Sequence, residues 1–74
     1  MGSSRIPVLT ELDGLVLRLS ATGLTTDEAA ERLGIAPDEV RRHLKAAIAT
    51  LGASSKLEAI VFALRRGLID LPGV

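Results

Sequence analysis

Residues 34–52 read GIAPDEVRRHLKAAIATLG, and this stretch defines one long helix and both of its ends. Pro37 fits the first position of a helix, where its missing N–H costs nothing and its restricted φ suits the helical backbone. Gly34 and Gly52 lie just outside the two ends, and glycine commonly follows the last turn of a helix in a left-handed conformation. The stretch therefore predicts a helix over Pro37–Leu51.

This helix has an apolar face and a basic face when its residues are wound at about 100° each. The apolar stripe consists of Val40, Leu44, Ala47, Ile48 and Leu51. Arg42 and Lys45 lie on the opposite side, with Arg41 at its edge. Asp38 and Glu39 occupy the first turn, where the helix dipole favours acids and disfavours cations. The acids are thus explained by the helix start, whereas the three cations indicate a surface that meets something negative.

Three other helix starts share one pattern, a hydroxyl residue followed three positions later by an acid. The pattern occurs at Thr10–Asp13, Thr25–Glu28 and Ser55–Glu58. It is typical of a capping box, in which hydroxyl and acid each accept from a backbone N–H of the first turn. Together with the glycines, these starts predict four helices: Thr10–Thr22, Thr26–Leu33, Pro37–Leu51 and Ser55–Arg66. No segment alternates with the period of a strand, so we expect an all-α fold, a four-helix bundle.

The second and third predicted helices are separated only by residues 34–36. A turn this short, with glycine at its start, is typical of a helix-turn-helix. Ala30, in the second helix, is small enough to let the third helix cross closely.

The composition excludes several classes of protein. Seventy-four residues form one domain, with nine basic and nine acidic side chains, one histidine and no cysteine. Without cysteine or clustered carboxylates, neither a catalytic triad nor a metal site can be assembled, so we expect no enzyme, no metal and no cofactor. The longest apolar run, Ala59–Leu64, is far shorter than the roughly 20 residues of a membrane span. We expect a cytoplasmic domain without a membrane partner.

The charges are unevenly divided along the chain. Residues 1–40 hold three basic and seven acidic side chains, whereas residues 41–74 hold six basic and two acidic ones. Such a split can give the domain a basic pole. Two interpretations of that pole remain open at this point: contact with DNA, or a protein-interaction module that uses the same face or the last helix.

Several motifs match one family in a single register: LT at 9–10, VLRL at 16–19, ATG at 21–23, EAAERLGI at 28–35, VRRH at 40–43 and LGASSKLEA at 51–59. With these motifs, residues 9–60 resemble the LuxR/GerE-type (NarL/FixJ-like) DNA-binding domain. The resemblance implies a helix-turn-helix of the winged-helix-like superfamily, without a wing. It implies a sequence-specific transcriptional regulator, bound to double-stranded DNA on the cytoplasmic nucleoid, whose third helix enters the major groove.

The resemblance also assigns roles to individual residues. Base contacts would come from Arg41, Arg42 and Lys45, and arginine or lysine can donate to the O6 and N7 acceptors of guanine. Phosphate contacts would come from Thr25, Thr26, His43, Thr50 and Lys56. His43 has an alternative role as a half-buried packing residue.

The chain departs from the family pattern near the expected phosphate path. Thr26 and Asp27 replace a usual Asn-Lys pair, Glu39 a Thr, Thr50 a common basic residue and Leu15 a Glu. Each lost phosphate contact weakens binding to any sequence, so we expect low affinity and reliance on a dimer or a partner protein. Loss of DNA binding is the alternative.

The last predicted helix has two apolar sides. We expect its core side to consist of Leu57, Ile60, Val61 and Leu64. Phe62 would then face outward, and the resemblance implies a homodimer through this helix, with an interface formed by Ala59, Phe62, Ala63 and Arg66. Packing of Phe62 under the tail at residues 68–71 is the alternative.

Residues 1–8 contain glycine, serine and proline without periodicity, and we expect a disordered lead-in followed by one domain over residues 9–74. Eight residues cannot hold a sensing domain. We therefore expect either a small stand-alone regulator or the output domain of a larger response regulator.

Overall fold

The computed structural model describes residues 9–70, which form four helices and no strand. The helices are α1 (Glu11–Ala21), α2 (Thr26–Leu33), α3 (Pro37–Leu51) and α4 (Lys56–Arg65). These bounds confirm the predicted all-α fold and each predicted helix to within one residue at either end. The predicted lead-in, residues 1–8, and residues 71–74 lie outside the described part of the chain.

The helix starts use the predicted hydroxyl caps, but the acids differ. Thr10, Thr25 and Ser55 each accept a hydrogen bond from the backbone N–H three residues later, at 3.1 Å. Only the α2 start is a full capping box, because Glu28 accepts in return from the Thr25 N–H at 2.8 Å. The carboxylate of Glu58 accepts instead from the N–H and the hydroxyl of Ser54. A cap of this kind stabilises a helix by about 1 kcal/mol.

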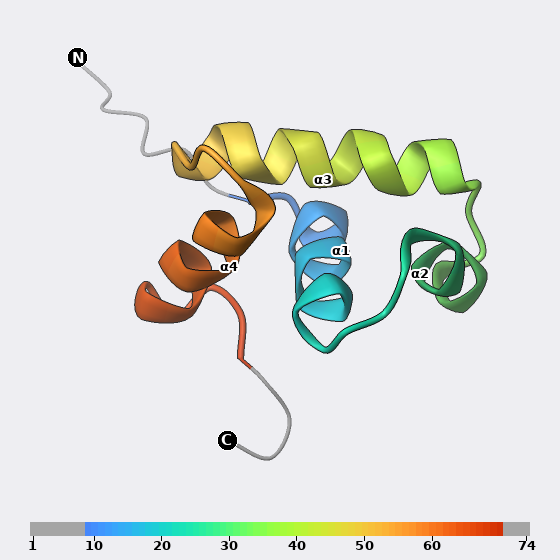
Figure 1. The fold of residues 1–74 in the computed structure, drawn as a ribbon, viewed down its shortest axis with the longest axis horizontal. Coiled ribbons are helices and arrows are strands. Elements are labelled where there is room, and N and C mark those ends of the chain that lie inside the picture. The colour runs from blue at the N-terminus through green and yellow to red at the C-terminus, as the bar shows by residue number, and fades with distance from the viewer. Residues whose placement is uncertain (1–8, 71–74) are drawn as a thin grey trace.

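α1 lies at the centre of the packing, and α3 runs across the other three helices (Figure 1). α1 and α3 each contact every other helix, whereas α2 and α4 do not contact each other in residues 9–70. Two apolar clusters result. Between α1, α2 and α3 lie Val16, Ala29, Ala30 and Val40. Between α1, α3 and α4 lie Leu17, Ala47, Leu51, Ala59, Ala63 and, from the tail, Ile69.

The turn between α2 and α3 has the predicted helix-turn-helix form. Gly34 adopts a left-handed conformation with φ 71°, which is accessible to glycine without strain. The N–H of Ile35 donates to the carbonyl of Ala30 at 3.1 Å, which completes the end of α2. Ala36 has no side-chain acceptor, but Glu39 reaches back and accepts from the Ala36 N–H at 3.1 Å.

The predicted core side of α4 was wrong. Leu57, Val61 and Leu64 are exposed, at 71%, 37% and 36%, whereas Ala59 and Ala63 are fully buried. Ile60, placed on the predicted core side, does pack against the cluster, and so does the half-buried Phe62. Alanines on the inner side let α4 approach α1 and α3 closely, and this proximity decides which of its two apolar sides is buried.

In residues 9–70, no helix alone has the length and apolar character to cross a membrane; α3 and α4 pass that test only when joined, and they are bent by 58° at their break.

Candidate nucleic-acid interface

α3 presents a basic face on the side opposite its buried stripe. Val40 and Ala47 are buried, whereas Arg41, Arg42 and Lys45 are all exposed. Ala46 and Ala49 are also exposed, and their small side chains leave space beside Lys45. The two predicted faces of α3 are therefore confirmed, and three cations within two turns of one helix are available to an outside anion.

Two of the three cations are paired with acids of the same helix. Arg41 Nη1 lies 2.6 Å from Asp38 Oδ1, and Arg42 Nη2 lies 3.7 Å from Glu39 Oε2. The guanidinium side chains are 57% and 70% exposed, so water screens both pairs and each contributes less than about 1 kcal/mol. Lys45 has no carboxylate within 4.0 Å among residues 9–70. The pairs therefore hold the two arginines only weakly, and another acceptor can replace the carboxylate in each pair.

The first turn of α2 offers a second group of donors. Its capping box uses the N–H groups of Thr25 and Glu28. The N–H groups of Thr26 and Asp27 have no protein acceptor in the described residues. Free N–H groups at a helix start favour an anion such as phosphate, although the exposed Asp27 carboxylate opposes it.

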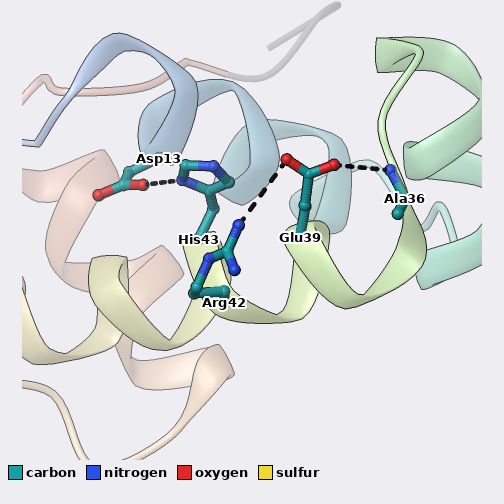
Figure 2. A network of polar contacts seen from close by, with 5 residues as sticks. All are labelled: Asp13, Ala36, Glu39, Arg42 and His43. Atoms are coloured by element: carbon teal, nitrogen blue, oxygen red, sulfur yellow. Dashed lines mark hydrogen bonds and ion pairs between the residues drawn. The ribbon is translucent and has the colours of Figure 1, made fainter.

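His43 joins α3 to α1 through a contact that Figure 2 shows from close by. Its ring atom Nδ1 lies 2.7 Å from Asp13 Oδ1. The Asp13 side chain is 7% exposed and the imidazole 25%. The Asp13 carboxylate therefore pairs with His43, and α1 has no complete capping box of the predicted kind. The half-buried position predicted as the alternative for His43 is confirmed, and a contact of its other nitrogen with phosphate stays a prediction.

The remaining predicted phosphate contacts lie where α3 ends and α4 begins. Thr50, in the last turn of α3, is half-buried, and Lys56, the first residue of α4, is exposed. Among the described residues no carboxylate pairs with Lys56. Lys56 is thus available to an anion, and Thr50 has less of its surface open.

Residues 7–63 match the model of the luxR family of bacterial regulatory proteins, GerE. The chain belongs to this family. It is accordingly a DNA-binding domain of the transcriptional-regulator type and not an enzyme, as the sequence predicted.

Two proteins with similar sequences support the assignment to the luxR family. The chain is 35% identical over 65 residues to the spore germination protein GerE of Bacillus subtilis (strain 168), covering 88% of each chain. It is 33% identical over 63 residues to the transcriptional regulatory protein YdfI of the same organism, and it spans only 30% of the length of that protein.

Solved structures show the same fold. The transcription factor GerE superposes with a TM-score of 0.80 at 29% identity, covering 84% of this chain and 92% of that one. The phage VqmA–DPO complex matches with a TM-score of 0.74 at 30% identity, covering 85% of this chain and 29% of that one.

The predicted dimer residues of this luxR-family domain need correction. Ala59 and Ala63 are 0% exposed inside the monomer, so neither side chain can contact a second copy directly. Phe62 is half-buried against the core, and Arg66 is exposed with its guanidinium 5.2 Å from the centre of the Phe62 ring. Because α4 is rotated relative to the prediction, its apolar residues open to solvent lie on the other side.

Two features of this luxR-family domain were not predicted from its sequence. The apolar residues exposed on α4 are Leu57, Val61 and Leu64, and Leu68, after the helix, is exposed as well. The spacing of the three helical residues, four and then three positions, is visible in the sequence, but it also fits a core stripe. The second feature is the role of Asp13, which the capping pattern had explained otherwise. Its partner is 30 residues away, and no local pattern indicates that distance.

Proposed function

We propose that this domain binds a specific DNA sequence by inserting α3 into the major groove. The observation that carries the proposal is the exposure of Arg41, Arg42 and Lys45 on the side of α3 opposite the buried stripe. The major groove is about 12 Å wide and admits an α-helix. An arginine can donate two parallel hydrogen bonds to guanine O6 and N7, and a lysine can donate to the same edge.

The acids of α3 do not prevent these contacts, but they weaken them. Asp38 pairs with Arg41 and Glu39 pairs with Arg42, and the arginine side chains of both pairs are exposed to solvent. A guanine edge would therefore compete for the same guanidinium donors. Each pair is worth about 0.2–0.5 kcal/mol, less than the about 1–3 kcal/mol of discrimination that a good bidentate base contact supplies. The carboxylates also repel nearby phosphates, which supports the low affinity expected from the sequence.

Phosphate contacts would orient α3 in the groove. The unpaired N–H groups at the start of α2 and the Thr25 and Thr26 hydroxyls would contact one strand. His43, Thr50 and Lys56 would contact phosphates on the flanks of α3. Such contacts fix the register of a protein on DNA without reading bases. A domain that acts in this way would work in the cytoplasm, on the nucleoid.

We further propose a homodimer through α4. The support is the exposed apolar stripe Leu57, Val61 and Leu64 of α4, with Leu68 also exposed after the helix, in place of the predicted Ala59 and Ala63. Contiguous exposed apolar residues on a small domain favour a protein interface. A two-fold pair would present two α3 helices to half-sites about one helical turn apart.

Selection of bound duplexes from a random pool tests the function. We expect enrichment of one motif with G·C pairs at the positions nearest α3, and binding that weakens steeply as salt rises. Arg42→Ala and Lys45→Ala should each lower affinity for the selected duplex about 10- to 100-fold and relax the preference at one position. Arg65→Ala removes the same charge as Arg42→Ala from the end of α4 and serves as the control.

The proposal fails if no duplex binds in low salt, or if Arg65→Ala and Arg42→Ala weaken binding to the selected and a scrambled duplex equally. In the second case, the cations would act only as diffuse charge.

A further inference from the structure

The histidine of α3 is held by a buried carboxylate on α1, and this pairing determines what the ring can donate. We propose that DNA binding by this domain takes up a proton at His43, and that Asp13 is the positioning residue that makes this proton necessary. The inference rests on the phosphate contact proposed for His43 above. Its basis is the bond between His43 Nδ1 and Asp13 Oδ1, at 2.7 Å, which leaves Nε2 as the second ring nitrogen.

The identity of the bonded atom sets the tautomer of the ring. An ionised carboxylate only accepts hydrogen bonds, so the nitrogen that faces Asp13 must carry a hydrogen. A neutral imidazole carries only one hydrogen, so Nε2 is then a bare acceptor. A bare acceptor cannot donate to a phosphate oxygen, which is itself an acceptor. When the ring takes up a proton, Nε2 becomes a donor and the ring gains a positive charge, and both changes favour a phosphate.

The second nitrogen is accessible to an outside partner. Among the described residues Nε2 has no hydrogen-bond partner, and no buried side-chain nitrogen or oxygen lacks one. The ring is 25% exposed. Nε2 is therefore not fully buried, and we expect a phosphate oxygen to approach it through its exposed surface.

The charged groups around the ring leave Asp13 as its anionic partner. On α1, Glu11 shares the first turn with Asp13 and is exposed. On α3, Glu39 lies one turn before the ring, and its carboxylate accepts from the Ala36 N–H and pairs with Arg42 (Figure 2). α2 and α4 provide no ion-pair partner to the ring within residues 9–70. Phosphate would be the second anion at the ring, on the side away from Asp13.

The coupling predicts the sign of the pH dependence. If the complex holds the proton and the free domain loses it as pH rises, affinity is highest at low pH and falls with a limiting slope of about tenfold per pH unit. Histidine rings commonly change charge between about pH 5 and 8. We expect the wild-type domain to bind about three- to tenfold more weakly at pH 8 than at pH 6.

Two variants test whether Asp13 positions the ring of His43 or only supports the fold. Asp13→Asn keeps the size of the side chain, and its amide can donate to Nδ1, which moves the hydrogen of the neutral ring to Nε2. This variant should bind with a flattened pH profile, because the neutral ring can now donate. A purely structural role for Asp13 would lower affinity by the same factor at both pH values. His43→Gln replaces the titrating ring by a neutral amide that can donate at any pH, so its profile should be flat.

The experiment is a fluorescence-anisotropy titration of the selected duplex with wild type, Asp13→Asn and His43→Gln from pH 6 to pH 8, at constant ionic strength. Circular dichroism verifies folding at each pH. In parallel, long-range proton–nitrogen NMR observes the ring directly, and the signals need no assignment because the chain has one histidine. At pH 8 we expect a neutral ring with hydrogen on Nδ1 in the free domain and a doubly protonated ring in the complex.

Two results would overturn the coupling: a wild-type affinity that does not change with pH, or a ring that is neutral in the complex. A wild-type slope retained in Asp13→Asn would remove the role of Asp13. If that variant does not fold, the ring signals of the wild type decide. Absence of any binding at pH 6 in low salt would defeat the proposed function as well, whereas binding with a flat profile defeats only this inference.

Discussion

The helices α3 and α4, which both pack on α1, differ in how plainly the sequence indicates which of their sides faces the core. On one side, α3 has three exposed cations opposite a buried apolar stripe, as its periodicity predicts. On the other side, α4 was placed with the wrong side inward. The difference shows that the buried side of a helix can be predicted from its sequence when one face is charged. It cannot be predicted in this way when both faces are apolar.

The reason lies in what each helix must exclude from the core. Arg42 and Lys45 cannot be buried without partners, so only one rotation of α3 is possible. In α4 either side can be buried, and Leu57, Val61 and Leu64 offer more apolar area than Ala59 and Ala63. The structure instead buries Ala59 and Ala63, because the narrow space beside α1 and α3 admits small side chains.

The largest expected effect tests this rotation of α4. Ala63→Asp places an unpaired charge among fully buried residues and should destabilise the domain by at least about 3 kcal/mol. Val61→Asp, on the exposed side, should cost about 1 kcal/mol or less. Chemical denaturation followed by circular dichroism compares the two. Equal losses would contradict the burial of the alanine side.

A middle effect concerns the exposed stripe of α4. If α4 forms the dimer, Val61→Asp should weaken self-association at least tenfold, or about 1.4 kcal/mol, in sedimentation equilibrium. Binding to a duplex with two half-sites should weaken with it, whereas binding to a single half-site should not change. A dimer that persists in this variant would show that another surface holds the copies together.

The smallest effect belongs to the acids at the start of α3. Asp38→Asn removes the carboxylate paired with Arg41 and one negative charge near the phosphate path. Affinity for any duplex in low salt should rise about two- to threefold, which corresponds to about 0.5 kcal/mol. Asp70→Asn makes the same change beside Arg18, at the far end of the domain, and is the matched control. An equal gain in both variants would indicate a net-charge effect alone.

Local sequence determined most of the secondary structure and the interface on α3. Caps at Thr10, Thr25 and Ser55 and the glycine after each helix act over three or four residues, so their effect can be read without the fold. The exposure of the cations of α3 can likewise be predicted from the sequence, because burying unpaired charges would cost too much free energy.

The tertiary structure alone decided which side of α4 is buried and which partner Asp13 takes. Both depend on residues far apart in the chain: the space left by α1 and α3 for Ala59 and Ala63, and the approach of His43 to α1 across 30 residues. No periodicity within one helix carries information about the shape of its neighbour. For that reason the cations of α3 could be placed from the sequence, whereas the group that positions the histidine beside them required the fold.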